Sequence, residues 1–207
     1  EASLQSLIFG EVRADLVKFT GGSFADYAKI GASNISPTNG KVNWKAYYAA
    51  INLANTLMYY DDEVFKKDQT FTKDMMDAVE AEALFIRALS YFYLVRLWKD
   101  VPLVLEASIS DTTDLYKPKS PENVVVQQII ADLLKAKEMA YSTEYKGTDY
   151  FYGRANKYSI TALLADVYLW SEQYQKSYDA CDEIINSGLY SLEPVDTWFN
   201  IYYPGNS

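Results

Sequence analysis

The chain has 207 residues, of which 49% are hydrophobic and 23% are charged, the proportions of a folded globular protein and not of a disordered one. The formal net charge of −9 repels phosphate backbones and anionic lipid headgroups, so no nucleic acid partner is expected. The chain has no histidine, which excludes Ser-His-Asp, Cys-His and His-ligated zinc sites from these residues.

Neither end of the sequence has the features of a natural terminus. Glu1 lies inside a helix-like segment with no initiator Met or targeting sequence before it, and residues 201–207 form a turn with no following element. We therefore expect both ends to be truncated. The longest apolar stretches are interrupted by Arg87, Arg96 and Lys99, so any membrane attachment is expected outside this chain.

Three stretches lack apolar periodicity and are predicted to be loops on a helical scaffold. They are residues 20–42, which are rich in Gly, Ser and Asn, residues 99–120, and residues 141–153, which carry several aromatic residues. Loops of this kind are the usual place for binding residues.

The first helix is predicted from about Trp44 to Tyr60, because apolar residues recur there at helical spacing. Asn55 is inserted in this apolar stripe, and a buried amide must be hydrogen-bonded. We interpret Asn55 as a structural residue that holds neighbouring backbone, not as a ligand. The stripe consists of Trp44, Tyr47, Tyr48, Ile51 and Met58.

A second helix is predicted between about Lys73 and Trp98, where apolar residues occupy two faces, so we expect this helix to be buried centrally. It ends before Pro102, because proline disfavours helical geometry at the preceding residue. The two arginines inside the helix are interpreted as partners of nearby acids. The arginines are Arg87 and Arg96, and the acids are Glu80 and Glu82.

A third helix is predicted over about residues 121–140, because its apolar residues line up on one face. Ser120 is the predicted N-cap and Pro121 the first helical position, where the missing N–H has no cost. The apolar face is formed by Val126, Ile129, Ile130, Leu133, Ala136 and Ala140.

Residues 154–187 are predicted to form an antiparallel helical hairpin, because only a short turn at residues 171–173 separates two apolar stripes. Gly188 is predicted to end the second helix in the left-handed conformation. The hairpin resembles a 34-residue tetratricopeptide unit, and residues 73–140 are predicted to form an earlier unit with an insertion in its turn. The residues with this spacing are Ala165, Tyr168, Tyr174, Ser177 and Cys181.

The predicted fold is therefore all-α, with tetratricopeptide-like helical hairpins and loop insertions in a single domain over residues 1–207. Cys181 is the only cysteine, so no intrachain disulfide can form. Because Cys181 falls on an apolar helix face, we interpret its thiol as a buried small hydrophobe.

Two long segments resemble the SusD/RagB family. Residues 80–106 (EAEALFIRALSYFYLVRLWKDVPLVLE) resemble its signature helix and Asp-Val-Pro-Leu exit, and residues 153–170 (GRANKYSITALLADVYLW) match in order and spacing. A weaker match is Trp44-x-x-Tyr47. The resemblance covers roughly residues 42–200, and Lys99 stands where the family usually has glycine, which would alter the turn.

The resemblance implies a tetratricopeptide-bearing lipoprotein on the outer-membrane surface of Bacteroidetes-type bacteria. Such a protein captures an oligosaccharide or polysaccharide for a SusC-like TonB-dependent transporter. The N-terminal lipid anchor and the large C-terminal half of the family are absent from this chain. No cofactor and no metal site are expected.

Sugar rings have apolar C–H faces and a rim of hydroxyls, so a glycan site needs flat aromatic rings beside hydrogen-bonding groups. Aromatic residues inside helices are interpreted as core, which leaves the loop aromatics as candidates; for them, anchoring of the loop to the body is the open alternative. The resemblance implies that the loop before the first helix contributes to this surface. The candidate glycan-binding residues are Phe24, Tyr27, Asn34, Asn39, Trp44, Tyr150 and Tyr152.

Two other classes of function are compatible with a helical chain of this composition. A glycosidase needs only two suitably spaced carboxylates, and the chain has 28 acidic residues, but they form no motif beside a strand end. We therefore predict that the protein is not an enzyme. A tetratricopeptide-like scaffold that binds a protein in its groove, without binding sugar, is the alternative function.

Overall fold

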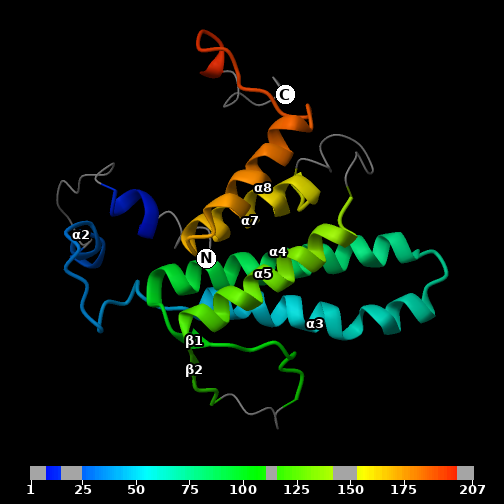
Figure 1. The fold of residues 1–207 in the computed structure, drawn as a ribbon. Helices are drawn as coiled ribbons and strands as arrows, with labels where there is room; N and C mark the ends of the chain where they lie inside the picture. Colours follow the sequence, from blue (N-terminus) through cyan, green and yellow to red (C-terminus); the bar gives the residue numbers. More distant parts are fainter. Residues whose placement is uncertain (1–7, 15–24, 111–115, 142–152, 200–207) are drawn as a thin grey trace.

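The computed structural model describes residues 8–14, 25–110, 116–141 and 153–199 of the chain. These residues are mostly helical, so the predicted all-α class is confirmed (Figure 1). The helices are η1 (Ile8–Val12), α2 (Ala25–Gly31), α3 (Lys45–Lys67), α4 (Lys73–Trp98), α5 (Glu122–Met139), α7 (Lys157–Trp170) and α8 (Tyr174–Asn186).

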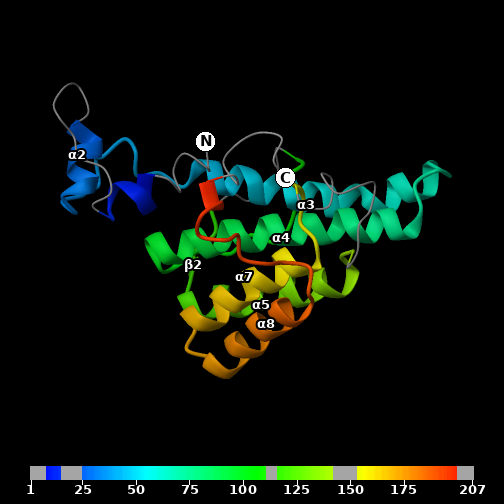
Figure 2. The same ribbon diagram turned by 90° about the horizontal axis from the view of Figure 1, so that it is seen from above.

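The five long helices form an array in which each packs mainly on its neighbours in the chain. Helix α4 lies between α3 and α5, α5 also contacts α7, and α7 pairs with α8 (Figures 1 and 2). The central burial predicted for residues 73–98 is confirmed, since α4 has the same bounds and buries side chains on several faces. The largest fully buried side chains of the array include Tyr47, Tyr91, Leu94, Ile129, Leu133 and Ile160.

Helix α4 begins with a side-chain cap and ends in an unusual turn. The Thr72 hydroxyl accepts a hydrogen bond from the Met75 backbone N–H. At the other end Lys99 has a φ of +60°, a conformation that favours glycine, while its N–H donates to the Val95 carbonyl. The chain then enters strand β1 (Val101–Pro102), which pairs antiparallel with β2 (Lys119–Ser120) and closes the base of the predicted 99–120 loop.

The start of α5 differs from the prediction. Pro121 occupies the N-cap position and Glu122 is the first helical residue, so the predicted Ser120 cap is wrong. Ser120 belongs to β2, and the ladder brings Asp100 to the helix start instead. The Asp100 carboxylate accepts a hydrogen bond from the Glu122 backbone N–H at 3.0 Å, where the positive end of the helix dipole favours an anion.

The predicted hairpin is present as α7 and α8. A capping box begins α7, because the Asn156 side chain and the Ser159 hydroxyl accept each other's backbone N–H groups. The Ser177 hydroxyl donates to the Ala165 carbonyl across the pair at 2.8 Å. Gly188 has a φ of +69° just beyond α8, which confirms the predicted left-handed stop.

The structure also corrects the predictions for Cys181 and for residues 20–42. Cys181 is exposed, because α8 packs on α7 through Ser177 and Ala180 and leaves the thiol on the outer side. Residues 20–42 are not loop throughout, since α2 lies within them and its Ile30 packs against Ile8 and Val12 in a small apolar cluster. Seven helical residues are too few to show apolar periodicity.

No helix in the described ranges is long and apolar enough to cross a bilayer.

Candidate functional site

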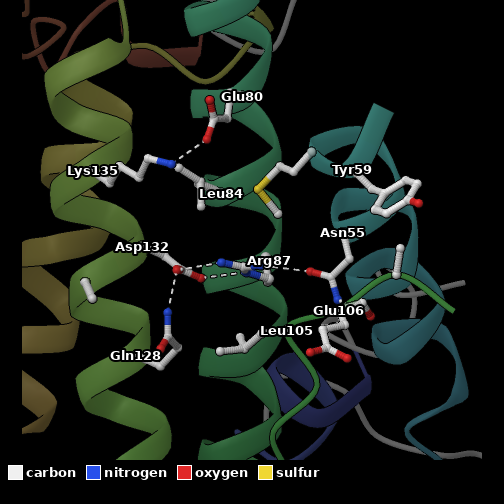
Figure 3. A pocket seen from close by; sticks show the side chains of 13 residues that line it. Asn55, Tyr59, Glu80, Leu84, Arg87, Leu105, Glu106, Gln128, Asp132 and Lys135 are labelled. Carbon is white, nitrogen blue, oxygen red and sulfur yellow. Dashed lines mark hydrogen bonds and ion pairs between the residues drawn. The ribbon is translucent and has the colours of Figure 1, made fainter. Parts of the chain in front are cut away.

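A pocket of about 690 Å³ lies between α3, α4 and α5 and is closed on one side by the segment that follows β1 (Figure 3). We call it the polar pocket. Both charged and apolar side chains face it. Its lining consists of Asn55, Met58, Tyr59, Glu80, Leu84, Arg87, Leu105, Glu106, Ala107, Gln128, Ala131, Asp132 and Lys135.

The floor of the polar pocket is a buried ion pair joined to an amide. Arg87 on α4 donates two hydrogen bonds of 2.7 Å to the Asp132 carboxylate on α5. The same guanidinium donates at 2.8 Å to the side-chain oxygen of Asn55 on α3. All three side chains are buried, so this network links three helices at one level of the array (Figure 3).

The amide of Asn55 also holds the wall of the pocket. Its nitrogen donates to the carbonyls of Val104 at 3.1 Å and of Glu106 at 3.2 Å. The structural role predicted for Asn55 is therefore confirmed.

Tyr91 holds the same wall from α4, because its hydroxyl donates to the Val104 carbonyl and accepts from the Val104 N–H. Burial raises the pKa of Tyr91 to about 12, and the Val104 N–H bond only partly opposes that rise. The Tyr91 phenol therefore stays protonated at neutral pH and remains a hydrogen-bond donor.

The predicted partners of the arginines are wrong. Arg87 pairs with Asp132, and Arg96 pairs with Asp166 on α7. The acids expected to serve them are bound elsewhere: Glu80 pairs with Lys135 and Glu82 pairs with Arg154. Glu80 and Glu82 lie five to sixteen residues before these arginines, outside the i,i+3 and i,i+4 spacing at which side chains of one helix meet, so acids on neighbouring helices pair with the arginines instead.

The rim of the pocket combines apolar and hydrogen-bonding groups. Gln128 donates its amide N–H to Asp132 at 2.7 Å, and Lys135 and Glu80 form an ion pair across the opening. The apolar part is formed by Met58, Leu84 and Leu105, with the exposed Tyr59 at the α3 edge. Such a lining can hold a small polar molecule that also has an apolar face. Nowhere in the described residues do three His, Cys, Asp or Glu side chains gather as a metal-ion site.

Two of the predicted glycan-binding residues lie together in the N-terminal part. Tyr27 on α2 is half-buried against the small apolar cluster, and the Lys41 ammonium lies 5.1 Å from the centre of its ring. Asn39 is 3% exposed; its amide donates to the Asp26 carbonyl and accepts from the Lys41 N–H. Asn34 is exposed in the turn after α2.

Trp44 belongs to the main core and not to the small N-terminal apolar cluster. Trp44 precedes α3 and packs against the main core, with its ring 5.8 Å from that of Tyr48 and 6.1 Å from that of Trp98. The remaining candidates are outside the described residues. These are Phe24, Tyr150 and Tyr152.

Sequence reasoning missed the polar pocket, although a signal for it was present. Asp132 interrupts the apolar face of α5 one position before Leu133, and Arg87 interrupts the apolar surface of α4. A charge at a buried position on each of two helices predicts that the two charges meet.

Comparison with known families decides the identity. A family profile described as SusD-like, starch-binding associating with outer membrane, matches residues 23–169. The chain belongs to the SusD-like family. The resemblance read from the sequence is therefore confirmed, and both the ion-pair helices and the Asp-Val-Pro-Leu exit fall inside the matched range.

The curated relatives that the chain matches are much longer than the chain. SusD-like protein P2 from Formosa agariphila is 30% identical over 203 residues, which cover 90% of this chain and 37% of the relative. SusD-like protein P38 from the same organism is 26% identical, with 95% of this chain and 38% of the relative covered. The chain thus spans less than two fifths of the length of these relatives.

Solved structures agree with the family. A SusD-like protein from Bacteroides fragilis superposes with a TM-score of 0.73 at 21% identity, over 98% of this chain and 38% of that one. A laminarin-binding SusD-like protein superposes with a TM-score of 0.69 at 26% identity, over 79% of this chain and 34% of that one. The tetratricopeptide-like arrangement of helical hairpins is therefore that of the SusD-like fold.

Proposed function

We propose that this SusD-like protein is a glycan-binding protein of an outer-membrane nutrient-uptake system. It captures an oligosaccharide or polysaccharide and passes it to a SusC-like TonB-dependent transporter. The observation that carries the proposal is the match of residues 23–169 to a family described as starch-binding and associated with the outer membrane. The similarity to a laminarin-binding relative supports a glycan as the ligand.

The proposed function implies a location in the cell and a domain organisation for this chain. The protein is a lipoprotein of the outer membrane, exposed at the cell surface. Its described helices form one domain with two tetratricopeptide-like units, one over residues 73–140 and one over residues 154–187. The function is binding and not catalysis, in keeping with the carbohydrate-binding character of the relatives.

Within this chain, the proposed glycan surface is the set of loop residues read from the sequence. Tyr27 has an aromatic ring that is only half-buried, and Asn34 is exposed. Trp44 contributes one edge of the main aromatic cluster. Asn39, Phe24, Tyr150 and Tyr152 complete the proposed set.

A glycan array screened with the intact protein tests the function. We expect binding to at least one neutral glucan, weakened about fivefold by Tyr27→Ala, which removes about 1 kcal/mol of ring contact. Trp44 is tested as Trp44→Phe and not as the alanine variant, because phenylalanine keeps the packing against Trp98 that alanine would lose. Intact protein that is folded but binds no glycan would leave only the protein-binding scaffold.

A further inference from the structure

We propose that the polar pocket is a second glycan subsite, which holds one neutral sugar unit. The inference rests on the proposed function, and it adds a site built from helices α3, α4 and α5. It would take a polyhydroxylated, uncharged ring. Four features of the pocket support it: its two-sided chemistry, its unused hydrogen-bonding groups, its charge and its rigidity.

The pocket has an apolar side and a polar side, as a pyranose ring has. Met58, Leu84 and Leu105 offer hydrocarbon and thioether surface, and the polar floor is formed by side chains of α4 and α5 (Figure 3). The C–H face of a sugar packs on apolar surface while its hydroxyls need polar partners. A purely apolar ligand would give no partner to the polar groups of the pocket that still have hydrogen-bonding capacity, which is costly.

Several polar groups of the pocket have hydrogen-bonding capacity left. A guanidinium has five N–H donors, and Arg87 uses three of them. Within the described part of the chain, the Gln128 side-chain oxygen and the Glu106 carboxylate accept no hydrogen bond. The pocket therefore offers both donors and acceptors, which suits a hydroxyl because a hydroxyl is both.

The charge of the pocket disfavours an anion. Arg87 is neutralised by Asp132, and Lys135 is neutralised by Glu80. The Glu106 carboxylate is then the unbalanced charge, so a uronic acid or a sulfated sugar would meet a like charge. A neutral sugar is not repelled by the Glu106 carboxylate.

The pocket is also held rigid before any ligand arrives. Asn55 links Arg87 to the carbonyls of Val104 and Glu106, and Tyr91 fixes the Val104 peptide from the other side. Binding groups that are already fixed lose little conformational entropy on binding, which favours affinity.

Calorimetric titration of the intact protein with maltoheptaose and laminariheptaose tests this subsite. Gln128→Ala removes a pocket amide but leaves both Arg87–Asp132 bonds, and Ala131→Trp at an exposed lining position fills the pocket. We expect the Kd for the bound probe to rise about fivefold in Gln128→Ala, the value of one hydrogen bond, and further in Ala131→Trp.

The matched control is Gln175→Ala on α8, which removes the same kind of amide-to-Asp179 bond far along the array and should leave the Kd unchanged. An unchanged Kd in both pocket variants, with wild-type protein still binding, overturns the subsite and leaves the proposed function standing. Tighter binding of an oligogalacturonate than of either neutral probe overturns the neutral class. Wild-type protein that binds no glycan overturns both proposals.

Discussion

The ion pair of Arg87 and Asp132 decides how three helices meet at one level. Two charges taken out of water lose solvation that their attraction only just offsets, so such a pair adds little net stability. The pair instead fixes the alignment of α4 against α5, because the two parallel bonds of a guanidinium to a carboxylate tolerate little displacement. Asn55 extends the same alignment to α3.

Replacement of one partner should therefore be much worse than replacement of both. We expect Asp132→Ala to lower the free energy of unfolding by about 3–5 kcal/mol, because it leaves Arg87 charged and buried without its counter-ion. The double variant Arg87→Met with Asp132→Leu should recover most of that loss. Guanidinium chloride unfolding followed by circular dichroism measures both.

The matched control for this pair is Asp166→Ala, whose partner Arg96 is exposed at the surface. It should cost less than about 1 kcal/mol. Equal losses from Asp132→Ala and Asp166→Ala would contradict the importance given to burial.

Lys99 stands at a backbone position that suits glycine. Its φ of +60° is strained for any residue with a Cβ, at a cost of about 1–3 kcal/mol. We expect Lys99→Gly to raise the free energy of unfolding by about 1 kcal/mol, since relief of strain exceeds the added entropy of the unfolded chain. Thermal unfolding measures this gain as a higher midpoint temperature. The control is Lys66→Gly inside α3, which should lower the midpoint temperature.

At the scale of elements, sequence periodicity predicted the helices well where an apolar stripe is long. The range 73–98 coincides with α4, whereas α3 runs seven residues past the predicted Tyr60, through the charged end where Glu63 and Lys67 pair. The partner of Arg87 lies 45 residues away, and its only signal in the sequence is the charge that Asp132 places in the apolar face of α5. The candidate loop residues depended on the aromatic and amide content of the predicted loops and, for the loop before the first helix, on family resemblance.

Glu183 ties the hairpin to the rest of the array. From α8 it forms ion pairs with Lys137 on α5 and Lys157 on α7. Burial raises the pKa of Glu183, but the hydrogen bonds and charges of the two lysines outweigh it and hold the pKa below its usual range. This contribution to stability is therefore complete above the unfolded pKa of about 4.3 and is lost as pH falls through the lower folded pKa.

We expect Glu183→Gln to lower the free energy of unfolding by about 0.5 kcal/mol at pH 7, the usual value of a half-exposed ion pair. The difference between variant and parent should vanish as the pH falls through the folded pKa of Glu183. Urea unfolding at pH 7 and at steps below pH 4.5 measures it. Glu138→Gln, at an exposed position on α5, is the control and should show no such pH-dependent difference.

At the scale of the whole molecule, both end helices of the array carry apolar side chains on their outer faces. On α3 a stripe with heptad spacing is open to solvent, with Leu53 71% exposed. On α8 a similar stripe includes Ile185, which is 72% exposed. The stripes consist of Leu53, Leu57, Tyr60 and Val64 on α3, and Tyr174, Tyr178 and Ile185 on α8.

Helical arrays that end in solvent need polar outer faces, and large exposed apolar patches favour association. We therefore expect the 207-residue chain on its own to bind a hydrophobic dye and to self-associate at micromolar concentration. The double variant Leu53→Lys with Ile185→Lys should reduce both effects, as analytical ultracentrifugation and dye fluorescence measure. Gln127→Lys with Gln175→Lys adds the same charge at polar positions and should change neither; if it reduces association equally, net charge and not the apolar stripes controls it.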